Sequence, residues 1–109
     1  MQNLADICKI ELSSIPQECV YNAHMFYAKA EDIEERTKLI NYLKESGILT
    51  VFHYISLHTS PAGKKFGRFN MVDKCTTKEG ERLLRLPMYY RLEKNQVEYI
   101  IDKIQYFYR

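Results

Sequence analysis

Apolar side chains recur at steps of three or four residues in residues 32–46, as they do on one face of an α-helix. This face consists of Ile33, Thr37, Ile40 and Leu43, with Leu39 beside it. Asp32 can cap the start of such a helix, and Gly47 stands where a residue in the left-handed conformation commonly ends one. The pattern therefore predicts a helix over residues 32–46.

A second amphipathic helix is predicted over residues 93–108. Its inward face would carry Val97, Ile100, Ile101, Ile104 and Phe107. A shorter helix is predicted from Thr76-x-x-Glu79, which has the spacing of a capping box, and this helix should run through Leu84.

The N-terminal stretch combines a helical and an extended pattern. Residues 1–9 place Leu4, Ile7 and Cys8 on one helical face, so they are expected to be the tail of a longer helix. Residues 10–16 are expected to be extended, because the residue before Pro16 is disfavoured in the helical conformation.

Three stretches rich in β-branched or aromatic residues predict strands: 22–29, 48–54 and 86–89. In the first, alternation puts His24, Phe26 and Ala28 on one face and mainly apolar residues on the other, as in an inner strand covered on two sides. Pro87 makes the third an edge strand. Residues 55–75 form a long connection, which is usually functional or contains short helical turns.

Together these elements predict a single α+β domain over residues 1–109, with a small antiparallel sheet and packed helices. The predicted order is α-β-α-β-α-β-α. The 46% hydrophobic and 28% charged content is that of an ordinary globular domain.

Charge and hydropathy exclude several classes of function. A net charge of +2, with acidic and basic residues mixed along the chain, does not indicate nucleic-acid binding. No apolar run approaches the ~20 residues of a membrane span, and the N-terminus is no signal peptide, so a cytoplasmic location is expected. Cys8, Cys19 and Cys75 are widely spaced, so they predict reduced structural thiols and no metal site.

The segment from Phe52 to His58 concentrates titratable side chains at the end of a predicted strand. His53, Tyr54 and His58 are candidates for contacting a ligand, although hydrogen-bonded structural histidines are the alternative. The spacing of the two histidines does not match a helical zinc motif.

Weaker candidates lie elsewhere in the chain. Lys64 and Lys65 flank glycines and are candidates for phosphate contacts, or are simply solvated. His24 is more often structural in such a setting. Arg36, between acidic neighbours, is expected in a surface ion pair. Neither a nucleophile motif nor a phosphate-binding loop occurs, so residue spacing alone predicts no reaction.

Five blocks resemble, in the same order, the C-terminal domain of the DegT/DnrJ/EryC1/StrS aminotransferases. They are Asn22–Tyr27, Arg36–Lys44, Phe52–His58, Ser60–Gly67 and Glu81–Met88. NAHMFY, FHY-x-x-LH and ERLLRLPM are most similar to the branch that aminates C4 of dTDP-4-keto-6-deoxyglucose, in enterobacterial common antigen and lipopolysaccharide biosynthesis. Ser56 departs from the usual Pro, and Ala28 from a larger aliphatic residue.

The resemblance implies the C-terminal small domain of a fold-type I aminotransferase, a homodimer that uses pyridoxal phosphate (PLP), with glutamate as amino donor and a nucleotide sugar as substrate. Residues 1–16 would be the end of a linking helix and an extended segment. The large domain, with the lysine that carries PLP, would be absent, so no catalytic residue and no bound cofactor are expected on this chain.

The implied role of the small domain is to close the substrate side of the cleft. His53, Tyr54 and His58 match the segment expected to line it, Lys64 and Lys65 are the weaker phosphate candidates, and His24 is the least expected contact. The chain alone is expected to be inactive. A free-standing module that binds a small molecule or a protein is the alternative.

Overall fold

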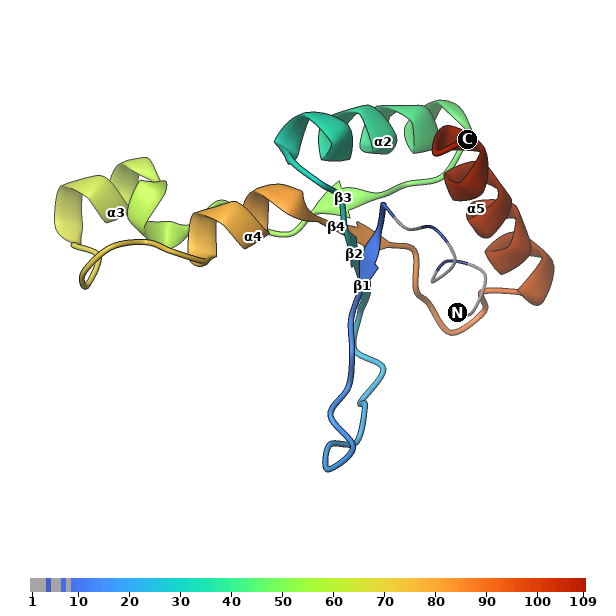
Figure 1. The fold of residues 1–109 in the computed structure, drawn as a ribbon, viewed down its shortest axis with the longest axis horizontal. Coiled ribbons are helices and arrows are strands. Elements are labelled where there is room, and N and C mark those ends of the chain that lie inside the picture. Colours follow the sequence, from blue (N-terminus) through green and yellow to red (C-terminus); the bar gives the residue numbers. More distant parts are fainter. Residues whose placement is uncertain (1–3, 5–6, 8) are drawn as a thin grey trace.

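Four short strands form one antiparallel sheet in the computed structural model, which describes Leu4, Ile7 and residues 9–109. The strands are β1 (Glu11–Leu12), β2 (Phe26–Lys29), β3 (Val51–Phe52) and β4 (Leu83–Leu86). Their order across the sheet is β1-β2-β4-β3. The predicted α+β class with a small antiparallel sheet is confirmed (Figure 1).

The helices differ greatly in length. They are α2 (Ile33–Glu45), the 3₁₀ turn η1 (Leu57–Thr59), α3 (Pro61–Phe66), α4 (Thr76–Arg82) and α5 (Lys94–Phe107). Among the described residues, no helix is long and apolar enough to cross a membrane. The helix predicted over residues 1–9 lies largely outside the described residues.

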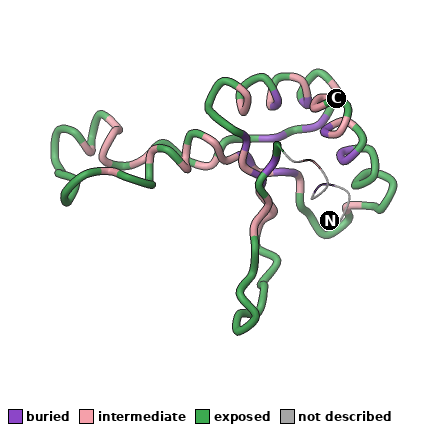
Figure 2. Tube along the Cα trace, in the orientation of Figure 1, coloured by how far each residue is buried: buried purple, intermediate pink, exposed green. Residues whose placement is uncertain are grey.

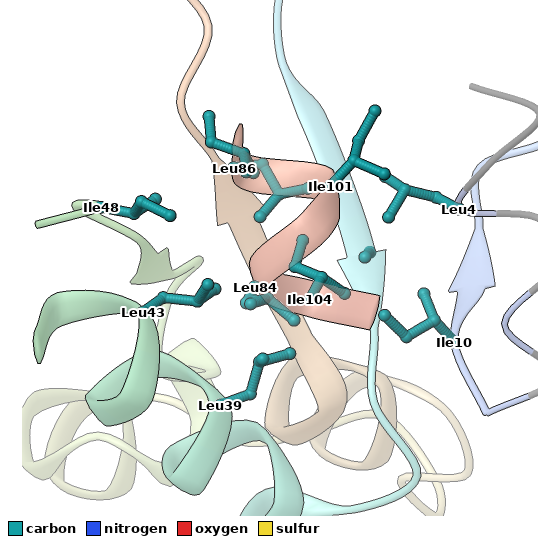
Figure 3. Packing of buried hydrophobic residues seen from close by; sticks show 11 residues of the cluster. Leu4, Ile10, Leu39, Leu43, Ile48, Leu84, Leu86, Ile101 and Ile104 are labelled. Carbon is teal, nitrogen blue, oxygen red and sulfur yellow. The ribbon is translucent and has the colours of Figure 1, made fainter. Parts of the chain in front are cut away.

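The core lies between one face of the sheet and the two long helices. Strand alternation points Ala28, Leu84 and Leu86 to this face, where α2 contributes Leu39 and Leu43 (Figure 3). From α5 come Ile100, Ile101 and Ile104, and the remaining buried members are Leu4, Ile10 and Ile48. Helices α2 and α5 are thus the layer that makes this sheet stable.

The predicted ends of the helix over residues 32–46 are confirmed. The Asp32 carboxylate accepts a hydrogen bond from the backbone N–H of Glu35, and Gly47 has a φ of 77°. The predicted inward face was partly wrong, because Leu39 is fully buried while Ile33 and Thr37 are exposed. The buried face of α2 is therefore rotated about the helix axis relative to the predicted face.

The strand predicted over residues 22–29 is shorter than expected. Ala23 has a φ of 52°, which interrupts extended backbone, so the strand begins only at Phe26. His24 is therefore exposed outside the strand, and its predicted place among apolar residues was wrong. The position of β2 inside the sheet is confirmed, but α2 and α5 cover only one of its faces.

The predicted edge strand over residues 86–89 was wrong. β4 ends at Leu86 and is an inner strand, paired with β2 and β3. Pro87 follows the last paired residue, so its missing N–H removes no hydrogen bond from the ladder. The strand predicted over residues 48–54 shrinks to the exposed pair Val51–Phe52, because β4 begins directly after α4 and offers little further partner.

The predicted capping box at Thr76 was also wrong. Cys75 is the residue that precedes α4, and it makes no side-chain capping bond. The Glu79 carboxylate instead accepts a hydrogen bond from Lys29 Nζ at 2.9 Å. The helix ends at Arg82 and not at Leu84. By contrast, α5 begins as predicted, with a capping box between Glu93 and Gln96.

Two segments project away from the sheet and helices (Figure 1). One is the β1–β2 connection, residues 13–25. The other, residues 55–82, holds η1, α3 and α4, and we call it the arm. Neither segment contains a buried residue, in contrast to the body of the fold (Figure 2). Of the two alternatives for residues 55–75, a functional connection or short helical turns, the structure shows the helical turns η1 and α3.

A group of charged side chains anchors α4 to the sheet. Lys29 Nζ lies 2.5 Å from a Glu11 carboxylate oxygen and 2.9 Å from one of Glu79. Arg82 contacts the same two carboxylates and donates a hydrogen bond from Nε to the Ala30 carbonyl at 2.8 Å. Hydrogen bonds from Lys29 lower the pKa values of both carboxyl groups. The base of the arm is therefore tied to β1 and β2.

Truncation of a core leucine and of an exposed leucine should lower the free energy of unfolding by very different amounts. Leu84 is 0% exposed and Leu57, in the arm, is 85% exposed. Leu84→Ala should lower the free energy of unfolding by about 2–5 kcal/mol because it leaves a cavity in the core. Leu57→Ala should change it little. Urea unfolding of both variants tests this, and equal losses would contradict the assignment of the core.

Candidate functional site

A cleft of about 300 Å³ lies where the end of β3 meets α2 and α4. Its lining is Ile33, Arg36, Phe52, Tyr54, Ile55, Ser56, Thr59, Thr76, Thr77, Gly80 and Glu81. Hydroxyl groups converge on it from both ends of the arm, and two aromatic rings, Phe52 and Tyr54, form part of its wall. Such a mixture suits a ligand with hydroxyl groups and an apolar ring face.

Arg36 reaches this cleft from α2. Its Nη1 donates a hydrogen bond to the Gly80 carbonyl at 3.0 Å, and its guanidinium lies 5.5 Å from the centre of the Phe52 ring. Burial lowers its pKa, but an arginine remains charged at neutral pH. The predicted surface ion pair was wrong, because Arg36 packs on the side of α2 that faces α4.

His58 is held by a carboxylate beside the cleft. His58 Nε2 lies 2.7 Å from Asp73 Oδ2, and the ring packs at 4.2 Å from that of Phe69. Asp73 also accepts hydrogen bonds from the backbone N–H of Thr77, at 3.2 Å, and from its hydroxyl. The Thr77 hydroxyl in turn lies 3.3 Å from Ser56 Oγ. This network joins η1 to α4 across the arm.

The Asp73 carboxyl group is the ionised centre of this network. The Thr77 hydroxyl, and after it His58, hold its pKa below the ordinary value of 3.8. Gly63 allows the neighbouring packing of α3 on η1, since an added Cβ would lie 1.7 Å from the Leu57 carbonyl oxygen. The arm is thus ordered by polar contacts and close backbone packing, without a buried core of its own.

His53 and Tyr54 lie together at the end of β3. Their ring centres are 4.4 Å apart, edge to face. His53 Nδ1 is buried and has no hydrogen-bond partner among the described residues. Tyr54 is 68% exposed and lines the cleft, whereas His53 does not. A ligand in the cleft would meet Tyr54, and His53 contacts the Tyr54 ring.

The other predicted contacts are not brought to this cleft. Lys64 and Lys65 are exposed on α3, and Lys65 Nζ lies 5.1 Å from the centre of the Phe66 ring. His24 is exposed on the β1–β2 connection. None of the three belongs to the lining, so their proposed roles rest on the resemblance alone.

Sequence reasoning did not identify Asp73 or Arg36 as site residues. Asp73 is 15 residues from His58 and carries no recognisable motif, so only the folded arm shows their pairing. Arg36 had a detectable signal, because it lies three residues before the buried Leu39 and so on the inward side of α2.

A metal site and a PLP site would need different residues. Among the described residues, no group of His, Cys, Asp and Glu is arranged to hold a metal ion, and Cys19 and Cys75 are free and exposed, while Cys8 lies outside the described residues. A lysine that carries PLP needs a lowered pKa. Lys29 has a raised pKa, owing to the hydrogen bonds that it donates to Glu11 and Glu79, and it does not line the cleft described above. Lys29 therefore does not fit the role of the lysine that carries PLP.

The His58–Asp73 pair predicts a pH-dependent ordering of the arm. Because the folded protein lowers the pKa of Asp73, the carboxylate stabilises the fold above pH 3.8, and this contribution is lost as the pH falls further. Asp73→Asn imitates the protonated group, so it should speed amide exchange in α4 at neutral pH. Asp102→Asn, at an exposed position of α5, is the matched control and should not.

Once the pH has fallen through the lowered pKa of Asp73, the wild-type chain should exchange in α4 as the Asp73→Asn variant does. An unchanged exchange rate in the variant at neutral pH would contradict the role assigned to Asp73.

The sequence and the fold both match known proteins. A pleiotropic regulatory protein of Geobacillus stearothermophilus is 32% identical over 104 residues, which cover 91% of this chain and 27% of that protein. DesV of S. venezuelae, solved with a ketimine intermediate, has a TM-score of 0.83 at 24% identity, over 99% of this chain and 29% of its own. NtdA of Bacillus subtilis, solved with bound cofactor PMP, has a TM-score of 0.77 at 22% identity, over 98% of this chain and 25% of its own.

This chain therefore spans little more than a quarter of the length of each of these relatives. The two structural matches show the fold, which is that of part of a fold-type I aminotransferase. Residues 1–105 match the sequence profile of one family over nearly the whole chain. The chain belongs to the DegT/DnrJ/EryC1/StrS aminotransferase family.

Proposed function

We propose that this chain is the substrate-side domain of a cytoplasmic, PLP-dependent nucleotide-sugar aminotransferase. The reaction transfers an amino group from glutamate to C4 of dTDP-4-keto-6-deoxyglucose and forms dTDP-4-amino-4,6-dideoxygalactose, for enterobacterial common antigen and lipopolysaccharide biosynthesis. Family membership over residues 1–105 supports aminotransfer. The choice of sugar rests on the similarity of NAHMFY, FHY-x-x-LH and ERLLRLPM to one branch.

The observation that carries the proposal is the convergence of hydroxyl groups on the cleft. Ser56 Oγ lies 2.7 Å from Thr59 Oγ1 and 3.3 Å from Thr77 Oγ1, so three hydroxyls form one continuous patch. Thr59 already donates its hydroxyl hydrogen to the Ser56 carbonyl, and Thr77 donates its own to Asp73, so both can accept a hydrogen bond from a sugar hydroxyl. Tyr54 adds a ring on which a sugar or a base can pack.

The histidines have separate roles in this proposal. His58 is oriented by Asp73 and positions the Thr77 hydroxyl, which lies 3.5 Å from His58 Nε2. His53 offers a ring nitrogen that has no partner among the described residues. Lys64 and Lys65 remain candidates for pyrophosphate contacts, and His24 is the weakest candidate.

PLP and the lysine that carries it belong, in this proposal, to a large domain outside these 109 residues. PLP supplies an electron sink when it is bound. The residues of this chain bind and orient the nucleotide sugar and exclude water from one side of the cleft. The whole enzyme is proposed to be a homodimer, and this chain alone to be inactive.

A non-catalytic binding module is the second candidate. One observation favours it: the relative from Geobacillus stearothermophilus is named a regulatory protein. The same cleft would then recognise a small molecule without turning it over. Turnover by the longer protein that carries this chain separates the two candidates.

Amination of the keto sugar tests the proposed function. The test uses this chain joined to a large domain of its family and loaded with PLP. This protein should convert dTDP-4-keto-6-deoxyglucose and glutamate to the amino sugar and 2-oxoglutarate. Mass spectrometry of the nucleotide sugar measures the product. The 109-residue chain alone, incubated with PLP, is the control and should form none.

The UDP-linked keto sugar in the same assay tests the nucleotide. Faster amination of the UDP sugar would contradict the dTDP assignment, and binding of the sugar without amination would favour the non-catalytic module.

His53→Ala tests the substrate-side assignment. In the active enzyme, the variant should raise KM for the keto sugar about tenfold, because a hydrogen bond worth about 1.5 kcal/mol is lost. Asn41→Ala, at an exposed position of α2, is the control. Unchanged KM and kcat in the His53 variant would show that this side chain does not contact the sugar nucleotide.

A further inference from the structure

Arg85 is a partly buried cation without an anionic partner. Its Nε is buried and makes no hydrogen bond, and its side chain forms no ion pair with any described residue. The contact found for its guanidinium is the Tyr54 ring, whose centre is 5.9 Å from Cζ. By contrast, Lys29 of β2 and Arg82 at the end of α4 each contact two carboxylates.

An unpaired guanidinium in such a place is energetically unfavourable. Removing a charge from water costs free energy unless hydrogen bonds or an opposite charge replace the water. A cation over an aromatic face recovers only a small part of this cost, which does not replace a carboxylate or phosphate. The fold therefore maintains a cation that is ready to accept an anion.

The position of Arg85 keeps it away from the hydrophobic core. It lies on β4 opposite Tyr27 of β2 and Val51 of β3, on the face of the sheet that α2 and α5 do not cover. None of these three residues is buried. The guanidinium is thus attached to an inner strand of the sheet, on its open face.

Tyr54 links Arg85 to the candidate site. Its ring lines the cleft, contacts the His53 ring and lies beside the Arg85 guanidinium. His53 Nδ1 is a second buried nitrogen without a partner among the described residues. Two side chains, each with a buried nitrogen that has no hydrogen-bond partner among the described residues, therefore contact one ring of the cleft lining.

We propose that Arg85, together with His53 and Tyr54, forms an oxyanion-binding subsite at the edge of this cleft. The planar guanidinium can donate two parallel hydrogen bonds to a phosphate or a carboxylate. His53 adds a further nitrogen and Tyr54 a hydroxyl. The identity of the oxyanion rests on the proposed function, in which it is either the pyrophosphate of the nucleotide sugar or a carboxylate of the amino donor.

Titration of the ¹⁵N-labelled chain with oxyanions tests this subsite directly. The probes are inorganic pyrophosphate and, separately, glutarate. The Nε–Hε signal of Arg85, identified by its absence in Arg85→Gln, should shift and saturate. Arg85→Gln should weaken binding of the preferred probe about tenfold or more, and Arg85→Lys should restore it only in part, because lysine lacks the fork of donors. Tighter binding of pyrophosphate would assign the oxyanion to the nucleotide sugar, and tighter binding of glutarate would assign it to the amino donor.

Arg91→Gln is the control, because it removes the same charge at an exposed position after the sheet. It should leave binding unchanged. Equal weakening by both variants, or an Arg85 signal that neither probe moves, would overturn the subsite. Thermal unfolding gives a second measurement: without a structural partner to lose, Arg85→Gln should keep the Tm of the wild type, and a marked fall would make Arg85 a structural residue.

The titration requires no catalysis, so the two proposals can fail separately. If the Arg85 signal shifts but the protein shows no amination activity, the oxyanion subsite is supported and the proposed function is contradicted. If the protein aminates the keto sugar but the Arg85 signal does not shift, the proposed function is supported and the subsite is contradicted.

Discussion

The pairing of β2 with β4 is the constraint on which the other elements depend. Four residue pairs, from Phe26 opposite Leu86 to Lys29 opposite Leu83, bring together two segments far apart in the sequence. This register sends Ala28, Leu84 and Leu86 to one face, where α2 and α5 bury them. A slip of one residue would turn these side chains to the open face and remove the core. Both edge strands, β1 and β3, pair with this central ladder.

The long helices cover only one face of the sheet, so polar side chains lie on and beside its other face. β4 follows α4 without an intervening loop, so the arm begins where the ladder ends. Arg36 bridges this junction from α2 through the Gly80 carbonyl. The cleft is therefore bounded by the rigid body on one side and by the arm on the other, and the arm is held by hydrogen bonds and ion pairs.

The sequence predicted best those elements whose signal is local and repeated. The helices α2 and α5 extend over several turns, so their periodicity was readable, and in α2 the caps were readable as well. Strand ends were not, because they depend on non-local facts: the positive φ of Ala23, and the partner available to each strand. Thr76 and Glu79 had the spacing of a cap, but Lys29 takes the Glu79 carboxylate in the folded chain.

The candidate site shows the same division. The segment that holds His53 and Tyr54 stood out because its titratable groups are adjacent in sequence. Asp73 and Arg85 did not, since their importance lies in what they contact, or lack, after folding. An arginine without an acceptor cannot be recognised from sequence, because neighbours along the chain do not define the partners of a side chain in a sheet.

The arm also bears on how such a protein can diverge. It leaves the sheet after β3 and returns to it in β4, and these two strands are paired neighbours. The sheet requires only that Val51 and Phe52 pair with Arg85 and Leu84, whatever the length and sequence of the segment that joins β3 to β4. Loop-closure entropy changes slowly with length, by about 0.6 kcal/mol for a doubling. Insertions, deletions and exchanges in this segment can therefore reshape one wall of the cleft while the hydrophobic core stays intact, so the cleft and the core are free to evolve at different rates.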